Sequence, residues 1–221
     1  MMIRQISLNH VLPSVFELDR ALFASSEVFL RPLTFERGRR YCINARSGRG
    51  KTSLCNFIYM SRRDFVGEIR FDNTDVRTLS DRQISRLRRR HLAYLPQELE
   101  LFDVLSALEN VQLKMNIAYD AGESRPDVVE WFTRLGIADR MHQLCGRLSV
   151  GQKQRVALIR ALSQPFDFLL LDEPVSHLDD ESNRLCANLI AERAEQLGAA
   201  VIFTSVGNPL LLDGDITSLT L

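Results

Sequence analysis

Residues 48–52 have the composition of a loop that binds phosphate groups. Gly48, Gly50, Lys51 and Thr52 stand between a short apolar stretch and an amphipathic one, the strand–loop–helix context of such a loop. Successive backbone N–H groups with a helix N-terminus behind them would surround phosphate oxygens, and the glycines would let the backbone approach closely. Lys51 would reach the terminal phosphates of a nucleoside triphosphate, and the Thr52 hydroxyl would hold Mg²⁺. A glycine-rich turn that binds nothing is the alternative.

One position departs from the phosphate-loop pattern G-x-x-x-x-G-K-[ST]. That pattern begins with glycine, and this chain has Ala45 there. Alanine adds a single methyl group, which is tolerable if the φ angle of residue 45 stays negative. We therefore expect a nucleotide-binding loop made of Ala45, Arg46, Ser47, Gly48, Arg49, Gly50, Lys51, Thr52 and Ser53.

Two carboxylates follow an apolar run further along the chain. Asp172 and Glu173 come directly after the apolar residues 168–171. A buried parallel strand delivers such residues to the carboxyl edge of its sheet, where ligands bind in open α/β folds. Asp172 is placed to hold Mg²⁺, and Glu173 to polarise a water for attack on a γ-phosphate. A strand that ends in a solvated acidic turn is the alternative, which the presence of both motifs in this order disfavours.

The elements that must position these groups alternate between strand and helix. Strands are expected at residues 3–8, 27–30, 33–35, 41–44, 68–71, 91–95, 166–171 and 200–204, and helices at 53–60, 80–90, 149–163 and 180–197. This alternation indicates an α/β domain with a largely parallel sheet. Residues 106–148 are mainly helical in pattern and interrupt the alternation, as an inserted subdomain would.

The composition excludes several classes of protein. With 221 residues, 45% of them hydrophobic, the chain can bury a core without disulfides or metals. Lys+Arg 28 equals Asp+Glu 28, whereas a general nucleic-acid binder carries a basic excess. No apolar stretch approaches the roughly 20 residues of a membrane-spanning helix, and the N-terminus lacks a signal peptide, so we expect a cytoplasmic protein. The four cysteines form no CxxC pair and are expected as buried thiols.

Several further segments carry a family resemblance. Residues 147–155 (RLSVGQKQR) resemble the LSGGQ signature, residues 94–97 (YLPQ) a Q-loop, and residues 176–179 (SHLD) a D-loop. Together with the phosphate loop and the acidic strand end, this ordered set resembles the ATP-binding subunits of ABC transporters over roughly residues 1–215. Residues 105–111 resemble most closely the lipoprotein-release, macrolide-export and cell-division subgroup.

The resemblance implies an architecture and an activity. It implies a P-loop NTPase: an ABC-ATPase core with an N-terminal antiparallel β subdomain and, at about residues 98–160, an inserted helical subdomain. Residues 1–221 would form a single ABC ATPase domain. It further implies ATP and Mg²⁺ as cofactors and head-to-tail pairing with an identical or dissimilar second ATPase subunit around two ATP. Such a subunit powers a separate transmembrane permease at the inner face of the cell membrane and needs no nucleic acid.

The resemblance also implies roles for single residues. The implied catalytic residues are Glu173, Gln97 and Ser205, and the implied Mg²⁺ ligands are Thr52, Gln97 and Asp172. The nucleotide-binding residues are those of the loop 45–53 and Phe16, a candidate for adenine stacking. The signature residues are Ser149, Val150, Gly151 and Gln152, and the D-loop residue is Asp179. The residue pattern independently supports the signature role, because Ser149-x-x-Gln152 is also a capping box that would begin a helix facing a γ-phosphate.

Departures from the family pattern leave alternatives open. Val150 replaces a glycine and cannot adopt a positive φ cheaply, while Ser205 replaces the usual switch histidine. With Ala45, these changes suggest slower hydrolysis, or a degenerate subunit that binds nucleotide with little turnover. A soluble, non-transport ABC protein is a third possibility. The basic run at residues 86–91 is interpreted as a helix end in preference to a lipid or partner contact.

Overall fold

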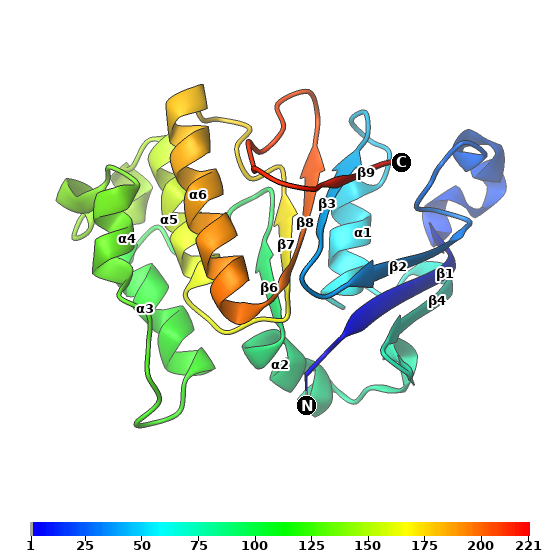
Figure 1. Ribbon diagram of the computed structural model, residues 1–221, viewed down its shortest axis with the longest axis horizontal. Helices are drawn as coiled ribbons and strands as arrows, with labels where there is room; N and C mark the ends of the chain where they lie inside the picture. Colours follow the sequence, from blue (N-terminus) through cyan, green and yellow to red (C-terminus); the bar gives the residue numbers. More distant parts are fainter. Residues whose placement is uncertain (1) are drawn as a thin grey trace.

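The parallel sheet stands at the centre of the molecule. The computed structural model describes residues 2–221 (Figure 1). The sheet order is β6-β7-β8-β3-β9, and each neighbouring pair is parallel. The strands are β3 (Arg40–Asn44), β6 (Leu92–Leu95), β7 (Phe168–Asp172), β8 (Ala200–Ser205) and β9 (Thr217–Thr220). The expected α/β class with a parallel sheet is confirmed, whereas β9 was not expected, because its residues are mostly exposed and show no apolar alternation.

A second, antiparallel sheet contains the N-terminal strand. Its order is β2-β1-β4-β5, formed by β1 (Gln5–Pro13), β2 (Pro32–Glu36), β4 (Phe65–Phe71) and β5 (Thr74–Asp75). The predicted strand at residues 27–30 is wrong. There the Ser26 hydroxyl accepts hydrogen bonds from the N–H groups of Val28 and Phe29, at 3.1 and 2.8 Å, and holds the segment in a turn. Val28 and Phe29 pack into the core from that turn, which accounts for the apolar pattern that resembles a strand.

Helices lie in each predicted helical stretch, although α1 begins two residues earlier than expected. They are α1 (Lys51–Ile58), α2 (Asp81–Arg90), α3 (Ala107–Ala118), α4 (Val128–Arg134), α5 (Val150–Leu162) and α6 (Asp180–Leu197), with 3₁₀ segments η1 (Ser14–Phe23), η2 (Val76–Thr78), η3 (Ala138–Arg140) and η4 (Cys145–Arg147). Ser80, Ser106 and Ser149 each form a complete capping box. Judged by length and apolar content, none of the helices within residues 2–221 qualifies as a membrane span.

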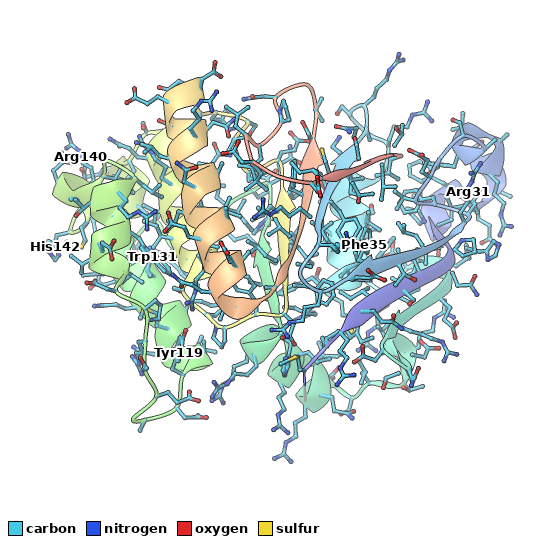
Figure 2. The ribbon with its side chains drawn as sticks, viewed as in Figure 1. Arg31, Phe35, Tyr119, Trp131, Arg140 and His142 are labelled. Atoms are coloured by element: carbon cyan, nitrogen blue, oxygen red, sulfur yellow. The ribbon has the colours of Figure 1, made fainter. Side chains whose placement is uncertain are left out.

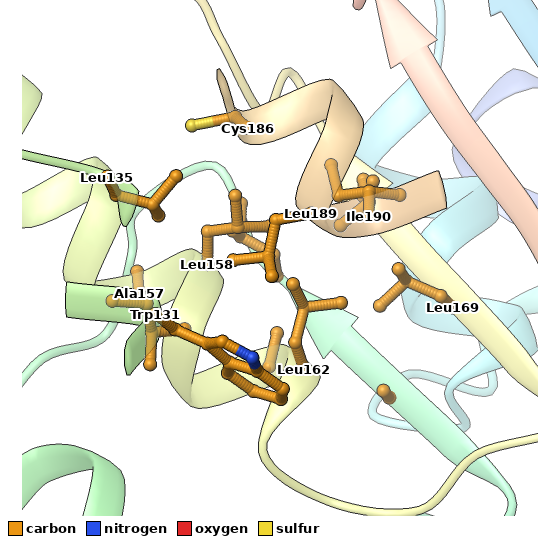
Figure 3. Packing of buried hydrophobic residues seen from close by; sticks show 14 of the residues in the cluster. Trp131, Leu135, Ala157, Leu158, Leu162, Leu169, Cys186, Leu189 and Ile190 are labelled. Atoms are coloured by element: carbon orange, nitrogen blue, oxygen red, sulfur yellow. The ribbon is translucent and has the colours of Figure 1, made fainter. Parts of the chain in front are cut away.

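The core explains the continuous apolar run of β7. Alternate residues of that strand enter two clusters: Leu169 and Leu171 pack toward α5 and α6, and Phe168 and Leu170 pack on the opposite face, toward α1. Figure 3 shows the first cluster, in which Trp131 of α4 lies against side chains of α5. Burial of each such large side chain stabilises the fold by about 1.5–3 kcal/mol. Both faces of the sheet are therefore covered, which fixes the strand ends in place.

The cysteines and the basic residues 86–91 both have structural roles within the fold. All four cysteines are free and buried, as expected, and burial raises the pKa of each thiol. The preferred interpretation of residues 86–91 also fits the structure. Arg88 donates to the backbone carbonyls of Tyr59 and Met60 at 2.9 and 2.6 Å. Arg89 and Arg90 pair with Asp120, so that these arginines join α2 to its neighbours.

Candidate functional site

The loop between β3 and α1 has the backbone geometry of a phosphate loop. Gly48 and Gly50 have φ angles of 76° and 90°, in the left-handed region that glycine enters without strain. A Cβ atom at Gly50 would lie 3.0 Å from Cε2 of Phe29, a tight contact that also favours glycine at this position. Ala45 has a negative φ, and its methyl group is accommodated as the sequence analysis required.

Lys51 lies inside this loop and points toward the end of β7. Its side chain is only 5% exposed. The ammonium donates hydrogen bonds to the carbonyls of Ala45 and Arg46, at 3.3 and 3.2 Å, and lies 3.6 Å from Oε1 of Glu173. The structure therefore brings together the lysine and the carboxylate that the sequence placed far apart in the chain.

The end of β7 holds two carboxylates in different surroundings. Asp172 is fully buried; its Oδ1 accepts a hydrogen bond of 2.7 Å from the Thr204 hydroxyl, and its Oδ2 has no partner among residues 2–221. Glu173, with a φ of 53°, donates its backbone N–H to the same hydroxyl at 3.0 Å. A buried carboxylate oxygen is costly to leave unpaired, so Asp172 is suited to a cation or to its water shell.

The remaining predicted metal ligands are oxygen donors close to the loop. The Thr52 hydroxyl lies 3.4 Å from Oε1 of Gln97. Within residues 2–221, no three His, Cys, Asp or Glu side chains are grouped to hold a metal ion. Mg²⁺ usually binds one or two carboxylates and completes its shell with water and substrate phosphates. A set of Thr52, Gln97 and Asp172 oxygens fits that chemistry.

A pocket of about 430 Å³ opens beside the loop. It is lined by Ala45, Arg46 and Arg49, by Ser205 at the end of β8, and by Leu22 of η1. The Ser205 carbonyl accepts a hydrogen bond of 3.4 Å from the Ala45 N–H. Ser205, the residue at the expected sequence position of the switch histidine, therefore lies next to the start of the loop.

The segment η1 was missed by the sequence analysis. Arg49 donates to the Leu22 carbonyl at 3.2 Å, and its guanidinium lies 6.0 Å from the centroid of the Phe23 ring. These contacts hold η1 against the loop. Phe16 packs on Phe23, with ring centroids 5.0 Å apart, and does not line the 430 Å³ pocket. No periodicity in residues 14–23 marks this placement.

The signature segment forms the exposed start of α5. Ser149 accepts a hydrogen bond of 3.3 Å from the Gln152 N–H, and the Gln152 side chain accepts one of 3.0 Å from the Ser149 N–H. Val150 is the first residue of the helix and does not have a positive φ. A Cβ atom at Gly151 would lie 3.3 Å from the carbonyl oxygen of His177, a tight contact, so this helix and the D-loop are closely packed at Gly151.

Gln154 connects this helix to the carboxylates. It is 2% exposed, and its Nε2 donates to the Glu173 carbonyl at 3.1 Å and lies 3.4 Å from the Ser176 hydroxyl. Its Oε1 accepts the His177 N–H at 3.2 Å. The sequence identifies Gln154 only as part of the signature motif and indicates no role for its side chain, because its neighbours come from another part of the chain.

The D-loop aspartate begins α6. Oδ1 of Asp179 accepts a hydrogen bond of 2.8 Å from the Ser182 N–H, and this bond lowers the pKa of the carboxyl. In Figure 1 the start of α5 and the loop before α1 lie along the same upper edge, with the ends of β7 and β8 between them. The two halves of the predicted site therefore lie apart on one edge of the molecule (Figure 1).

Comparison with known proteins gives consistent results. A family model described as "ABC transporter" matches residues 32–176. A macrolide export ATP-binding/permease protein, MacB, of Rhodopseudomonas palustris is 35% identical over 78% of this chain; the match covers 26% of MacB, so the chain spans about a quarter of its length. An uncharacterized ABC transporter ATP-binding protein of Thermotoga maritima is 33% identical over 79% of this chain and 76% of that protein.

Solved structures share the fold. The chain is similar to a dimeric structure of a post-hydrolysis state of the ATP-binding cassette MJ0796 bound to ADP and Pi, with a TM-score of 0.71 and 27% identity over 79% of this chain and 77% of that one. A second dimeric MJ0796 structure has a TM-score of 0.78 over 97% of this chain and 94% of that one, at 24% identity.

Proposed function

Because the chain belongs to the ABC transporter family of ATP-binding ATPases, we propose that it binds ATP at the Lys51 loop and hydrolyses it to power a membrane transporter. The single observation that carries this proposal is the 3.6 Å approach of the Lys51 ammonium to the Glu173 carboxylate. A phosphate-binding cation and a candidate base meet there at the carboxyl edge of a parallel sheet, where ligands of such folds bind.

Each residue of the site has a distinct part in this chemistry. Lys51 and the N–H groups of residues 48–52 hold the β- and γ-phosphates. Thr52, Gln97 and Asp172 would hold Mg²⁺, which supplies neutralisation of phosphate charge when bound. The Glu173 carboxylate orients the attacking water and accepts its proton. Ser205, beside Ala45, is placed to donate a hydrogen bond and cannot provide a positive charge.

Two cassettes complete each site in this proposal. At the start of α5, formed by Ser149, Val150, Gly151 and Gln152, the capping box uses the N–H groups of Ser149 and Gln152, which leaves those of Val150 and Gly151 for an anionic ligand, and a helix N-terminus favours such a ligand. Since this start and the Lys51 loop lie apart on one edge, a head-to-tail pair would close each ATP between the loop of one copy and α5 of the other. Asp179 would contact the second cassette. The pair is either a homodimer or a heterodimer.

The partner and location follow from the proposed role. A separate permease would hold the cassette at the inner face of the membrane. The segment after Gln97 would transmit its motion, and residues 98–160 would act as the helical subdomain within a single domain of residues 1–221. Phe16 remains our candidate for adenine stacking, although its ring is engaged with Phe23.

Steady-state ATP turnover of four proteins tests the proposal. We expect slow turnover in the natural chain, an increase in Ser205→His because an imidazole can provide the missing cation, and a loss of at least about 100-fold in Glu173→Gln. Lys51→Ala should lose ATP affinity. Unchanged ATP affinity in Lys51→Ala would refute the site. Equal turnover in the natural chain and in Ser205→His would refute the proposal that Ser205 slows hydrolysis. ATP binding without turnover in every protein would favour a degenerate subunit that binds nucleotide but does not hydrolyse it.

A further inference from the structure

A pocket of about 250 Å³ lies between α2 and the antiparallel sheet. Its walls include Ile3, Phe71 at the end of β4, and His91 directly before β6. Lys51 and Glu173 do not line it. In Figure 1, α2 and the N-terminus lie at the lower edge of the molecule, whereas the phosphate loop before α1 lies at the upper edge. We call this hollow the α2 pocket; it is separate from the nucleotide site, and the chemistry assigned above leaves it unused.

The floor of the α2 pocket is apolar. Ile3 and Phe71 are buried members of the core cluster, and Leu79 and Leu87 are partly buried and pack against the same cluster. All four side chains line the pocket. A concave, mostly apolar hollow with a few polar groups is the usual form of a site for a small molecule. The floor therefore favours a ligand with an apolar part.

Two side chains of opposite charge line the same pocket. Asp72 follows β4, and its Oδ1 accepts hydrogen bonds of 3.0 Å from the N–H groups of Arg4 and Gln5, whereas its Oδ2 has no hydrogen-bond partner among residues 2–221. Arg86 of α2 is exposed. Within the described residues, neither side chain forms an ion pair with the other or with a third group. The pocket thus offers one carboxylate and one guanidinium to a ligand.

The other arginines near the end of α2 are already engaged within the fold. Arg88 donates to backbone carbonyls at the end of α1, and Arg89 and Arg90 pair with Asp120. Arg86 differs from these three because it faces the pocket without an anionic partner among residues 2–221.

Two further polar side chains of the pocket wall also have partners. Oε1 of Gln83 accepts the Ser80 N–H at 2.9 Å in the capping box of α2, and Nδ1 of His91 lies 2.7 Å from Oδ2 of Asp167. Their orientation is thus set by the fold. Asp72 and Arg86 remain as the charged groups that a ligand can engage.

We propose that the α2 pocket binds a free α-amino acid with an apolar side chain. Its carboxylate pairs with Arg86, its ammonium pairs with Asp72, and its side chain covers the apolar floor. A guanidinium can bind a carboxylate through two parallel hydrogen bonds. An apolar acid without an ammonium would bring its charge near Asp72 uncompensated, and an apolar amine would do the same near Arg86. The two opposite charges therefore select a zwitterion.

Four small molecules test this proposal by isothermal titration calorimetry on the full chain. L-Leucine carries both charges and an isobutyl group; 4-methylpentanoate lacks the ammonium, 3-methylbutylamine lacks the carboxylate, and glycine lacks the apolar side chain. We expect L-leucine to bind at least about tenfold more tightly than each of the other three. No detectable L-leucine binding, or equal affinity for L-leucine and any one of the other compounds, would overturn the proposal.

Two variants assign each charge of the ligand to its partner. In Arg86→Gln the carboxylate loses its partner, so L-leucine and 3-methylbutylamine should bind equally. In Asp72→Asn the ammonium loses its partner, so L-leucine and 4-methylpentanoate should bind equally, while the amide oxygen can still accept from the N–H groups of Arg4 and Gln5. Persistence of the natural chain's preferences in either variant would contradict the assignment.

Control variants separate the α2 pocket from other cationic surfaces. Arg82→Gln removes an exposed arginine of α2 that does not line the pocket, and it should keep the preferences of the natural chain. Lys51→Ala should also bind L-leucine as the natural chain does, and loss of binding there would place the amino acid at the phosphate loop instead. Thermal unfolding confirms that each variant is folded.

Discussion

Gln154 shows how one buried side chain can join two parts of a site. Its amide uses both ends, donating to the Glu173 carbonyl and accepting from the His177 N–H. Glu173 has a φ of 53°, which costs a non-glycine residue energy unless its surroundings hold it there. Gln154 therefore acts as a positioning residue for the carboxylate and couples it to the start of α5.

We predict that Gln154→Leu lowers kcat for ATP by about 100-fold while ATP affinity stays within about twofold, because the carboxylate is displaced and the phosphate loop is not. The substitution also leaves the buried partners of Gln154 unpaired, at a cost of about 1–3 kcal/mol in unfolding free energy. Steady-state kinetics and urea unfolding measure both effects. Gln112→Leu, at an exposed position of α3, is the matched control. An equal fall in kcat and affinity would contradict a positioning role.

The free energy of unfolding depends on pH through Lys114. Burial, followed by the charges of Arg160 and Arg88, lowers the pKa of Lys114 to about 8. The unfolded chain keeps the Lys114 proton up to about pH 10.5 and the folded chain only to about pH 8. The cost of burying the ammonium is fully present below pH 8 and is relieved as the pH rises to 10.5. We predict that the stability of the natural chain relative to Lys114→Met increases by about 2–3 kcal/mol over this range. Urea unfolding at several pH values measures the difference, and a constant difference would refute the prediction.

At the scale of elements, α5 begins at a residue with two separable tasks. Ser149 stabilises the helix through its capping box and would also face a phosphate of the second cassette. The Ser149 hydroxyl would serve both tasks, so loss of activity in a single variant would not distinguish them.

Two substitutions separate the tasks. Ser149→Ala removes the cap, and we expect it to lower the unfolding free energy by about 1 kcal/mol and to reduce ATP turnover. Ser149→Asp keeps a good cap and should retain stability, but its negative charge would repel the γ-phosphate and reduce turnover as well. Calorimetry, which measures the stability of each variant, and ATP turnover together distinguish the capping task from the phosphate-binding task. Full activity in Ser149→Asp would argue against a phosphate at the start of α5.

At the scale of the whole molecule, a buried aspartate joins the two sheets. Asp167 accepts a hydrogen bond of 2.7 Å from the Ile3 N–H near the N-terminus, pairs with Nδ1 of His91 at 2.7 Å, and lies 3.4 Å from Nε of Arg37. Those groups come from the residues just before β1, the junction between α2 and β6, and the turn between β2 and β3. Figure 2 shows Arg31 at one end of the molecule's longest axis and Arg140 and His142 at the other.

We predict that Asp167→Asn lowers the unfolding free energy by about 2–3 kcal/mol, because the neutral amide leaves Arg37 without its charge partner and, if its oxygen keeps the Ile3 and His91 bonds, turns an N–H donor toward the guanidinium. Asp64→Asn is the matched control. Its carboxylate pairs with Arg62 on the surface, and the expected change is below about 1 kcal/mol. Urea unfolding measures both. Equal effects would show that the buried connection contributes no more than a surface ion pair.

Local chemistry made much of this protein predictable from sequence. The spacing of Gly48, Gly50 and Lys51 is a backbone requirement, and the apolar run before Asp172 follows from a strand covered on both faces. Each capping serine acts on residues three positions away. Such signals depend on neighbours along the chain, so the fold class, the helix starts and the positions of the phosphate loop and the acidic strand end were readable.

Only the tertiary structure decided the contacts made between distant segments. The turn at Ser26, the docking of η1 by Arg49, and the two-ended role of Gln154 involve packing that leaves no periodic trace in the sequence. The same holds for Lys114, whose burial without a carboxylate depends on α3 lying over the core. A side chain's type states what bonds it can make, but its solvation and its partners are set by whichever remote residues the fold brings beside it.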